Sequence, residues 1–210
     1  DTSNNEYEEV CVMKKFIREN IDHQPIVDNV FKIVNLANDA IAKKGKENIV
    51  NATIGSLYDE DGNLVALDTV FNTYNSLDNR TKAKYASSFN GNPNFRKQVY
   101  NWVVQDTKLD LCHSVIGTPG GSGAVSSTIL NVLDEGQTLI IPHIAWGNYK
   151  SMATIANCKV QAYQMFDGDT FNITSFKETC CEVMARQGKV LAIINDPCHN
   201  PTCLLYTSDA

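Results

Sequence analysis

The sequence predicts an α/β fold with a mainly parallel sheet. From residue 111 onward, short runs rich in valine and isoleucine alternate with helical patterns, as expected where helices cover a parallel sheet. A glycine-rich turn follows the first of these runs and leads into a helix. The 210 residues, 43% of them hydrophobic, are sufficient for a globular core.

The elements of this α/β portion follow from the periodicity of apolar residues. We expect strands over residues 114–117, 138–141, 160–163 and 190–195. We expect helices from Ser122, after Gly147 and over residues 174–186.

The portion before residue 111 is predicted to be mostly helical. Apolar residues recur at three- and four-residue steps after Pro25, and Gly45 marks the end of that helix. We expect a looser helix over residues 6–20, further helices over 67–77 and 93–105, a short strand over 49–53 and a polar loop over 55–62.

Charge and cysteine content limit the classes of partner. The net charge of -6 comes without a long basic block, so we expect neither nucleic acid nor an anionic membrane as a partner. The seven cysteines include no C-x-x-C pair, which favours reduced thiols over a disulfide framework or a zinc site. No apolar run is long enough to cross a bilayer, and the polar start is unlike a signal peptide. These features predict a cytoplasmic location.

The glycine-rich turn is the densest motif, and it spans Gly117–Ala124. Glycines let a ligand approach the backbone, and the free N–H groups at a helix start favour a phosphate. The turn lacks the lysine of a P-loop, and no acidic residue follows at the distance that a dinucleotide fold requires. It therefore points to another phosphorylated cofactor, although a tight strand-to-helix turn alone also explains such a cluster.

Two further motifs follow later strands. Trp146 lies just after the run over 138–141, where its indole could stack on a flat ring or pack in the core. Asn200 lies in His199-Asn200-Pro201-Thr202, after the run over 190–195. Because the carboxyl ends of parallel strands share one edge of a sheet, we expect both motifs to lie near the glycine-rich turn.

The order and spacing of these motifs resemble class I aminotransferases of the aspartate and aromatic type. The resemblance rests on the glycine-rich turn, the Trp-Gly-Asn element and His-Asn-Pro-Thr, and it extends to Ile54-Gly55-Ser56-Leu57-Tyr58 and to Tyr85 with the helix after it. It covers most of residues 48–202. It implies the fold-type-I architecture of pyridoxal-phosphate enzymes, with part of the large domain and the N-terminal part of the small domain.

The resemblance also implies roles for individual residues. Gly121 and Ser122 would hold the phosphate of pyridoxal 5'-phosphate, Trp146 would stack on its ring, and Asn200 would donate a hydrogen bond to its phenolic oxygen. Gly55 would contact the substrate carboxylate through its backbone. Tyr85 would reach the phosphate in a neighbouring subunit, which implies a homodimer. The substrates would be an amino acid and a 2-oxo acid.

The same resemblance divides the chain into residues 1–60 of the small domain and 61–202 of the large domain. Residues 203–210 resemble a translated sequencing adapter, and we expect them to be an artefact that is foreign to the parent protein. The family has glycine where Cys203 stands. The lysine that forms the Schiff base follows the Asn-Pro-Thr loop in the family, so we expect no catalytic residue within this chain. We also expect a chain of this extent to be inactive and not to fold normally by itself.

Two alternative functions stay open at this point. A carbon–sulfur lyase that uses pyridoxal phosphate would share the fold and the cofactor residues. A nucleotide-binding module with a glycine-rich loop belongs to another class and would not absorb visible light. The sequence does not identify which amino acid is the substrate.

Overall fold

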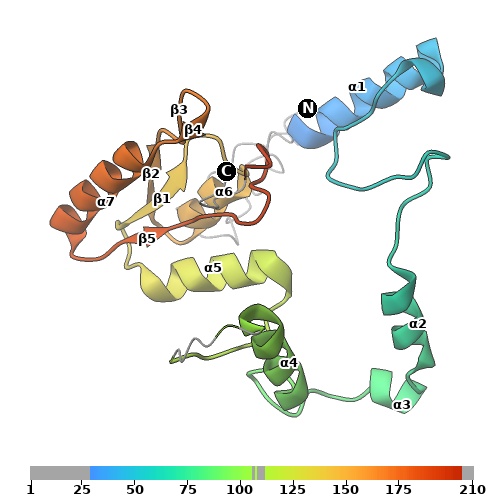
Figure 1. Ribbon diagram of the computed structural model, residues 1–210, viewed down its shortest axis with the longest axis horizontal. Helices are drawn as coiled ribbons and strands as arrows, with labels where there is room; N and C mark the ends of the chain where they lie inside the picture. The colour runs from blue at the N-terminus through green and yellow to red at the C-terminus, as the bar shows by residue number, and fades with distance from the viewer. Residues whose placement is uncertain (1–28, 106, 108–111, 205–210) are drawn as a thin grey trace, which may run out of the picture. The chain divides into compact units, whose positions relative to one another are not determined.

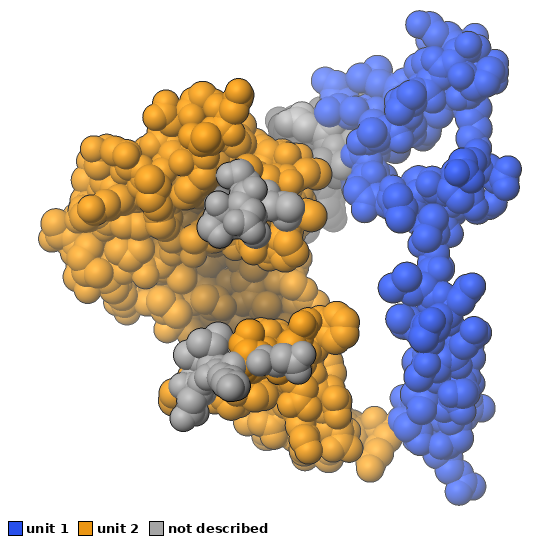
Figure 2. All heavy atoms as spheres, in the orientation of Figure 1, with its two compact units in different colours: residues 1–83 blue, residues 84–210 orange. Residues whose placement is uncertain are grey.

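The computed structural model describes residues 29–105, 107 and 112–204 (Figure 1). The helix expected over residues 6–20 lies outside these residues. The chain divides into two compact units, residues 1–83 and 84–210, which Figure 2 colours separately. The division of the parent fold at residues 60 and 61 is a different boundary and stays a prediction.

The first unit is helical. Its elements are α1 (Asn29–Lys44), the 3-10 helix η1 (Lys46–Asn48), α2 (Asp68–Ser76) and α3 (Asn79–Lys82). Gly45 ends α1 as expected: its φ is +87°, and its N–H donates to the carbonyl oxygen of Ile41 at 2.9 Å. The helix expected to end at Gly45 and the helix expected over 67–77 are confirmed, while the expected helix start at Pro25 lies outside the described residues.

The second unit contains the sheet. Its helices are α4 (Pro93–Val104), α5 (Gly120–Val132), α6 (Asn148–Ile155) and α7 (Ile173–Gln187). Its strands are β1 (Thr138–Pro142), β2 (Lys159–Tyr163), β3 (Phe166–Asp167), β4 (Thr170–Phe171) and β5 (Leu191–Ala192). Apart from the small antiparallel β3–β4 pair, the strands form a parallel sheet in the order β2-β1-β5. The predicted α/β fold with a mainly parallel sheet is confirmed.

Helices cover both faces of the sheet because side chains alternate along each strand. Leu139 and Ile141 of β1 face a buried cluster that includes Ile129 of α5 and Ala153 of α6. Ile140 between them faces a second cluster, on the side of α7. All five residues of β1 are buried, as expected for a strand between two helical layers (Figure 1).

Two of the predicted strands were wrong. Residues 49–53 form none, because the N–H and the hydroxyl of Thr53 both donate to Oδ1 of Asn51, at 3.2 and 2.8 Å, and such local bonds compete with strand pairing. Residues 114–117 form none because no strand of the described part of the chain pairs with them; the Gly117 N–H instead donates to Asn90 in a loop. The strand expected over 190–195 is shorter, although the Ile193 N–H still donates to Ile140 at 3.0 Å.

None of the helices in the described part of the chain combines the length and the apolar character needed to cross a membrane.

Candidate functional site

The sheet topology places three of the predicted site elements at one edge. α5 leads through residues 133–137 into the amino end of β1 and packs along the sheet through Ile129, so its own amino end lies toward the carboxyl edge. Trp146 follows the carboxyl end of β1, and Asn200 follows that of the parallel strand β5. Both lie in the segments that follow these strand ends.

The amino end of α5 offers backbone donors to a ligand. The helix begins at Gly120, two residues before the expected start, so Gly121 and Ser122 lie in its first turn. Pro119 occupies the N-cap, and in the described part of the chain no side chain caps this helix start. A Cβ built on Gly121 would have no atom within 4 Å, and Ser122 is exposed. Uncapped N–H groups with the positive end of the helix dipole fit a phosphate.

Trp146 is half-buried and is held from two sides. Its indole packs against the buried cluster that contains Ile129 and Leu139. It also meets the ring of Tyr149 nearly at right angles, with ring centroids 5.4 Å apart. Burial raises the pKa of the Tyr149 phenol, which keeps this neighbour uncharged. The indole therefore lies on the sheet face that α5 covers.

The loop of Asn200 is held by its own side chains. Oδ1 of Asn195 accepts the Asn200 N–H at 2.8 Å, which closes the loop after β5. His199 is only 1% exposed, and its Nδ1 lies 2.9 Å from the hydroxyl oxygen of Thr202. Desolvation lowers the pKa of His199, so its neutral form is favoured. While the backbone is fixed in this way, Asn200 itself is exposed at the tip.

Leu204 anchors the end of this loop. Its carbonyl oxygen accepts the His199 N–H at 2.9 Å, and its side chain packs on the buried cluster beside α7. Cys203 adopts φ +58°, the left-handed conformation that glycine tolerates best. The expectation that residues 203–210 come from a sequencing adapter stays a prediction. Residues 205–210 lie outside the described residues.

The two remaining predicted residues belong to different units. Tyr85 precedes α4 in the second unit and is 92% exposed. Gly55 belongs to the first unit, where the Ser56 N–H donates to Ile54 at 2.8 Å across it, and a Cβ at Gly55 would meet open space. Both have accessible surroundings, and their roles stay predictions.

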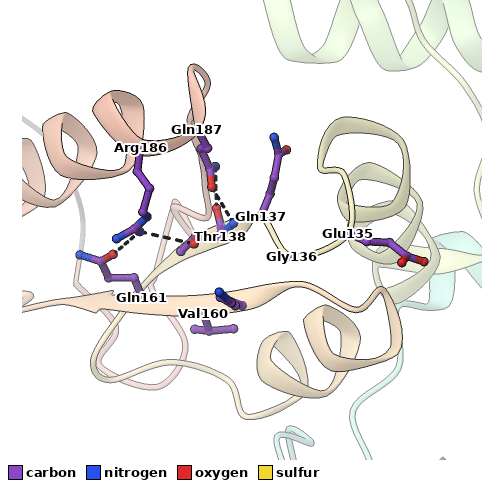
Figure 3. A pocket seen from close by; sticks show the side chains of 9 residues that line it. Glu135, Gly136, Gln137, Thr138, Val160, Gln161, Arg186 and Gln187 are labelled. Atoms are coloured by element: carbon purple, nitrogen blue, oxygen red, sulfur yellow. Dashed lines mark hydrogen bonds between the residues drawn. The ribbon is translucent and has the colours of Figure 1, made fainter. Parts of the chain in front are cut away.

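A cavity of about 610 Å³ opens at the opposite, amino edge of the sheet (Figure 3). The guanidinium of Arg186 donates there to Oε1 of Gln161 at 2.8 Å, and the Gln187 side chain bonds both the N–H and the carbonyl oxygen of Thr138. These bonds tie the end of α7 to β1 and β2. They explain the polar lining as a structural network, away from the glycine-rich turn.

Sequence reasoning missed two residues beside the site. His143 follows β1 directly, and its Nδ1 accepts the N–H of Met165 beyond β2 at 3.0 Å. Tyr149 lies three residues after Trp146 and is buried against it. His143 could have been noticed as a polar residue directly after a buried strand. Tyr149 could have been noticed because it lies three residues after Trp146, about one helical turn.

Comparison with known proteins identifies the family. The family model for aminotransferases of class I and II matches residues 47–210. The chain belongs to this family. Its members use pyridoxal 5'-phosphate. The groups described above have chemistry that suits this cofactor: backbone N–H groups that can donate to a phosphate, an indole that can stack on a flat ring and a carboxamide that can donate a hydrogen bond.

Similar proteins agree with this assignment. An aromatic-amino-acid aminotransferase of Paracoccus denitrificans is 24% identical over 135 residues, which cover 63% of this chain and 34% of that protein. An aspartate aminotransferase of Musicola paradisiaca is 26% identical over 121 residues, which cover 57% of this chain and 29% of that protein. The chain therefore spans only about a third of the length of these relatives.

Solved structures support the fold. An aminotransferase of Anaerococcus prevotii is 32% identical, with a TM-score of 0.84, over 92% of this chain and 47% of that one. An aromatic amino acid aminotransferase solved with 3-indolebutyric acid is 19% identical, with a TM-score of 0.69, and the match covers 90% of this chain and 47% of that one. The fold-type-I architecture expected from the sequence is thereby confirmed, for part of the fold.

Proposed function

We propose that the protein containing this chain transfers an amino group between an amino acid and a 2-oxo acid, with pyridoxal 5'-phosphate as cofactor. The observation that carries the proposal is the family match over residues 47–210. Within this range the uncapped start of α5 lies toward the carboxyl edge of the sheet, and Trp146 and Asn200 follow strands that end at that edge.

Each residue has a defined part in this proposal. The N–H groups of Gly121 and Ser122, with the Ser122 hydroxyl, bind the phosphate and fix the position of the cofactor. The indole of Trp146 packs on the ring and excludes water from it. The Asn200 carboxamide donates to the phenolic oxygen and favours its anionic form. When bound, the cofactor supplies an electron sink for the substrate's α-carbon.

The substrate and the partner subunit involve the other two residues. The exposed backbone of Gly55 contacts the substrate carboxylate, and the exposed phenol of Tyr85 reaches the phosphate bound by a second copy of the protein. A homodimer with shared sites follows, in the cytoplasm. No lysine in residues 1–210 lies in a context that suits the catalytic base, so we place that lysine outside this chain.

The test uses the full-length protein, supplied with pyridoxal 5'-phosphate. We expect it to convert 2-oxo acids to amino acids, with aspartate and the aromatic amino acids as the first donors to assay because the similar proteins act on these classes by name. Release of a thiol without amino transfer would favour the carbon–sulfur lyase instead. Absence of visible absorbance together with nucleotide binding would favour the nucleotide-binding module.

A further inference from the structure

His143 joins the loop after β1 to the loop after β2. Its backbone N–H donates at 2.9 Å to the carbonyl oxygen of Tyr163, the last paired residue of β2, and His143 itself lies one residue beyond the last paired residue of β1. The next hydrogen bond between the two segments involves the imidazole ring, whose Nδ1 accepts the N–H of Met165 at 3.0 Å. A side chain thus accepts the bond that a backbone carbonyl would accept if the ladder continued.

This hydrogen bond selects one tautomer of the neutral ring. Met165 is fully buried, and a buried N–H without an acceptor costs roughly 1–3 kcal/mol. Nδ1 can accept only when it carries no proton, so the proton of the neutral ring resides on Nε2. The geometry therefore assigns one tautomer to His143.

The anchored segment is short and leads directly to the indole. Trp146 lies three residues after His143, before α6 begins at Asn148. On the other side, the carbonyl oxygen of Met165 accepts the Asn172 N–H at 2.9 Å, which ties the same point to the start of α7. The imidazole is thus the side-chain link that fixes the start of the Trp146 loop against β2.

We propose that His143 is a positioning residue for Trp146: as an acceptor at Nδ1, it holds the loop so that the indole keeps its place at the carboxyl edge. The consequence for cofactor binding rests on the function proposed above, while the position of the indole does not. His143 acts through Trp146 and itself contacts no reacting atom.

The test compares His143→Asn with His143→Val in the full-length protein. Asparagine keeps an acceptor near the position of Nδ1, whereas valine keeps none. The readout is tryptophan fluorescence without cofactor, and subtraction of the Trp146→Phe spectrum isolates the emission of Trp146. We expect valine to shift this emission to the red and to increase its quenching by acrylamide, and asparagine to restore both toward the unsubstituted protein.

A second readout is the affinity for pyridoxal 5'-phosphate. We expect it to fall about tenfold in His143→Val, the effect of about 1.4 kcal/mol, and to recover in His143→Asn. Unchanged Trp146 emission in the valine variant, or equal changes in both variants, would overturn the role of His143. If valine shifts the emission while Trp146→Phe binds the cofactor normally, the positioning role holds and the cofactor contact of Trp146 fails.

A further measurement needs no substitution, so it applies even if the valine variant does not fold. Nitrogen NMR of the full-length protein labelled with 15N-histidine distinguishes the two neutral tautomers. We expect His143 to carry its proton on Nε2. A proton on Nδ1 would contradict the hydrogen bond to Met165 and with it the proposal.

Discussion

The amide nitrogen of Gly117 lies 2.9 Å from the carbonyl oxygen of Asn90, and this hydrogen bond ties the glycine-rich turn to the loop before α4. Gly91 makes the close approach possible. Its φ is +90°, and a Cβ built on it would lie 3.3 Å from the nitrogen and 3.4 Å from the Cα of Gly117. The loop before α4 therefore supports the segment that leads into α5.

Gly91→Ala should weaken this support. The left-handed conformation alone costs alanine roughly 1–2 kcal/mol, and the contact with Gly117 adds to it. Gly136→Ala is the matched control, because Gly136 has φ +79° but a Cβ there meets no atom within 4 Å. We expect thermal unfolding of the full-length protein to show a larger loss of stability for Gly91→Ala than for Gly136→Ala. Equal losses would show that the contact with Gly117 contributes nothing.

Cys203→Gly should stabilise the loop that carries Asn200. Cys203 adopts φ +58°, which glycine accepts without the steric cost of a Cβ, roughly 1 kcal/mol. In a protein that carries Cys203 and Leu204, amide exchange at His199 measures the effect, because its N–H is bonded to Leu204 across this turn. We expect exchange to slow in Cys203→Gly and to quicken in Cys203→Val, whose branched side chain tolerates this φ least. The same rate in all three proteins would argue against a strained turn.

The pH dependence of stability should reflect the buried His199. Desolvation lowers its pKa in the folded protein below the ordinary value of 6.5, so below about pH 6.5 the unfolded chain binds a proton that the folded chain does not. Stability should therefore be retained above this pH and fall as the pH decreases through it. Melting temperatures of the full-length protein measured from about pH 8 to pH 5 should show this decline.

The control for this prediction is His199→Gln, which cannot take up a proton in that range. We expect the variant to be less stable at pH 8, because it loses the contact with Thr202, but to show a smaller decline toward pH 5. A decline of the same size in both proteins would assign the effect to other groups.

The sequence predicted helices and the buried strand β1 well because their signals are local. Gly45 marks the end of α1, and Pro93 marks the start of α4. The strand over residues 138–141 is buried along its whole length, including the side chain of Thr138. The strands expected over 49–53 and 114–117 failed because a strand needs a neighbour, which no local pattern provides. The β3–β4 hairpin was missed although Gly168-Asp169 between paired residues is a typical two-residue turn.

The sequence motifs named candidate residues for the site but not the contacts that support them. Motifs at strand ends named Ser122, Trp146 and Asn200 as candidates, since a parallel sheet brings such ends to one edge, and the roles of these residues stay predictions. The contacts that hold them could not be predicted in this way, although the position of His143 directly after a strand was an available signal. The bond from Met165 to His143 links positions 22 residues apart, and only the register of β1 with β2 brings them together.

The most direct test of the account is a titration of the full-length protein with pyridoxal 5'-phosphate, followed by visible absorbance, for the unsubstituted protein and for Ser122→Ala, Trp146→Leu and Asn200→Ala. If the three groups surround one cofactor, each variant should bind it about 10- to 100-fold more weakly, as for the loss of a hydrogen bond to a charged group or of a stacked ring. An unchanged dissociation constant in all three variants would contradict the assignment of this edge of the sheet as the cofactor site.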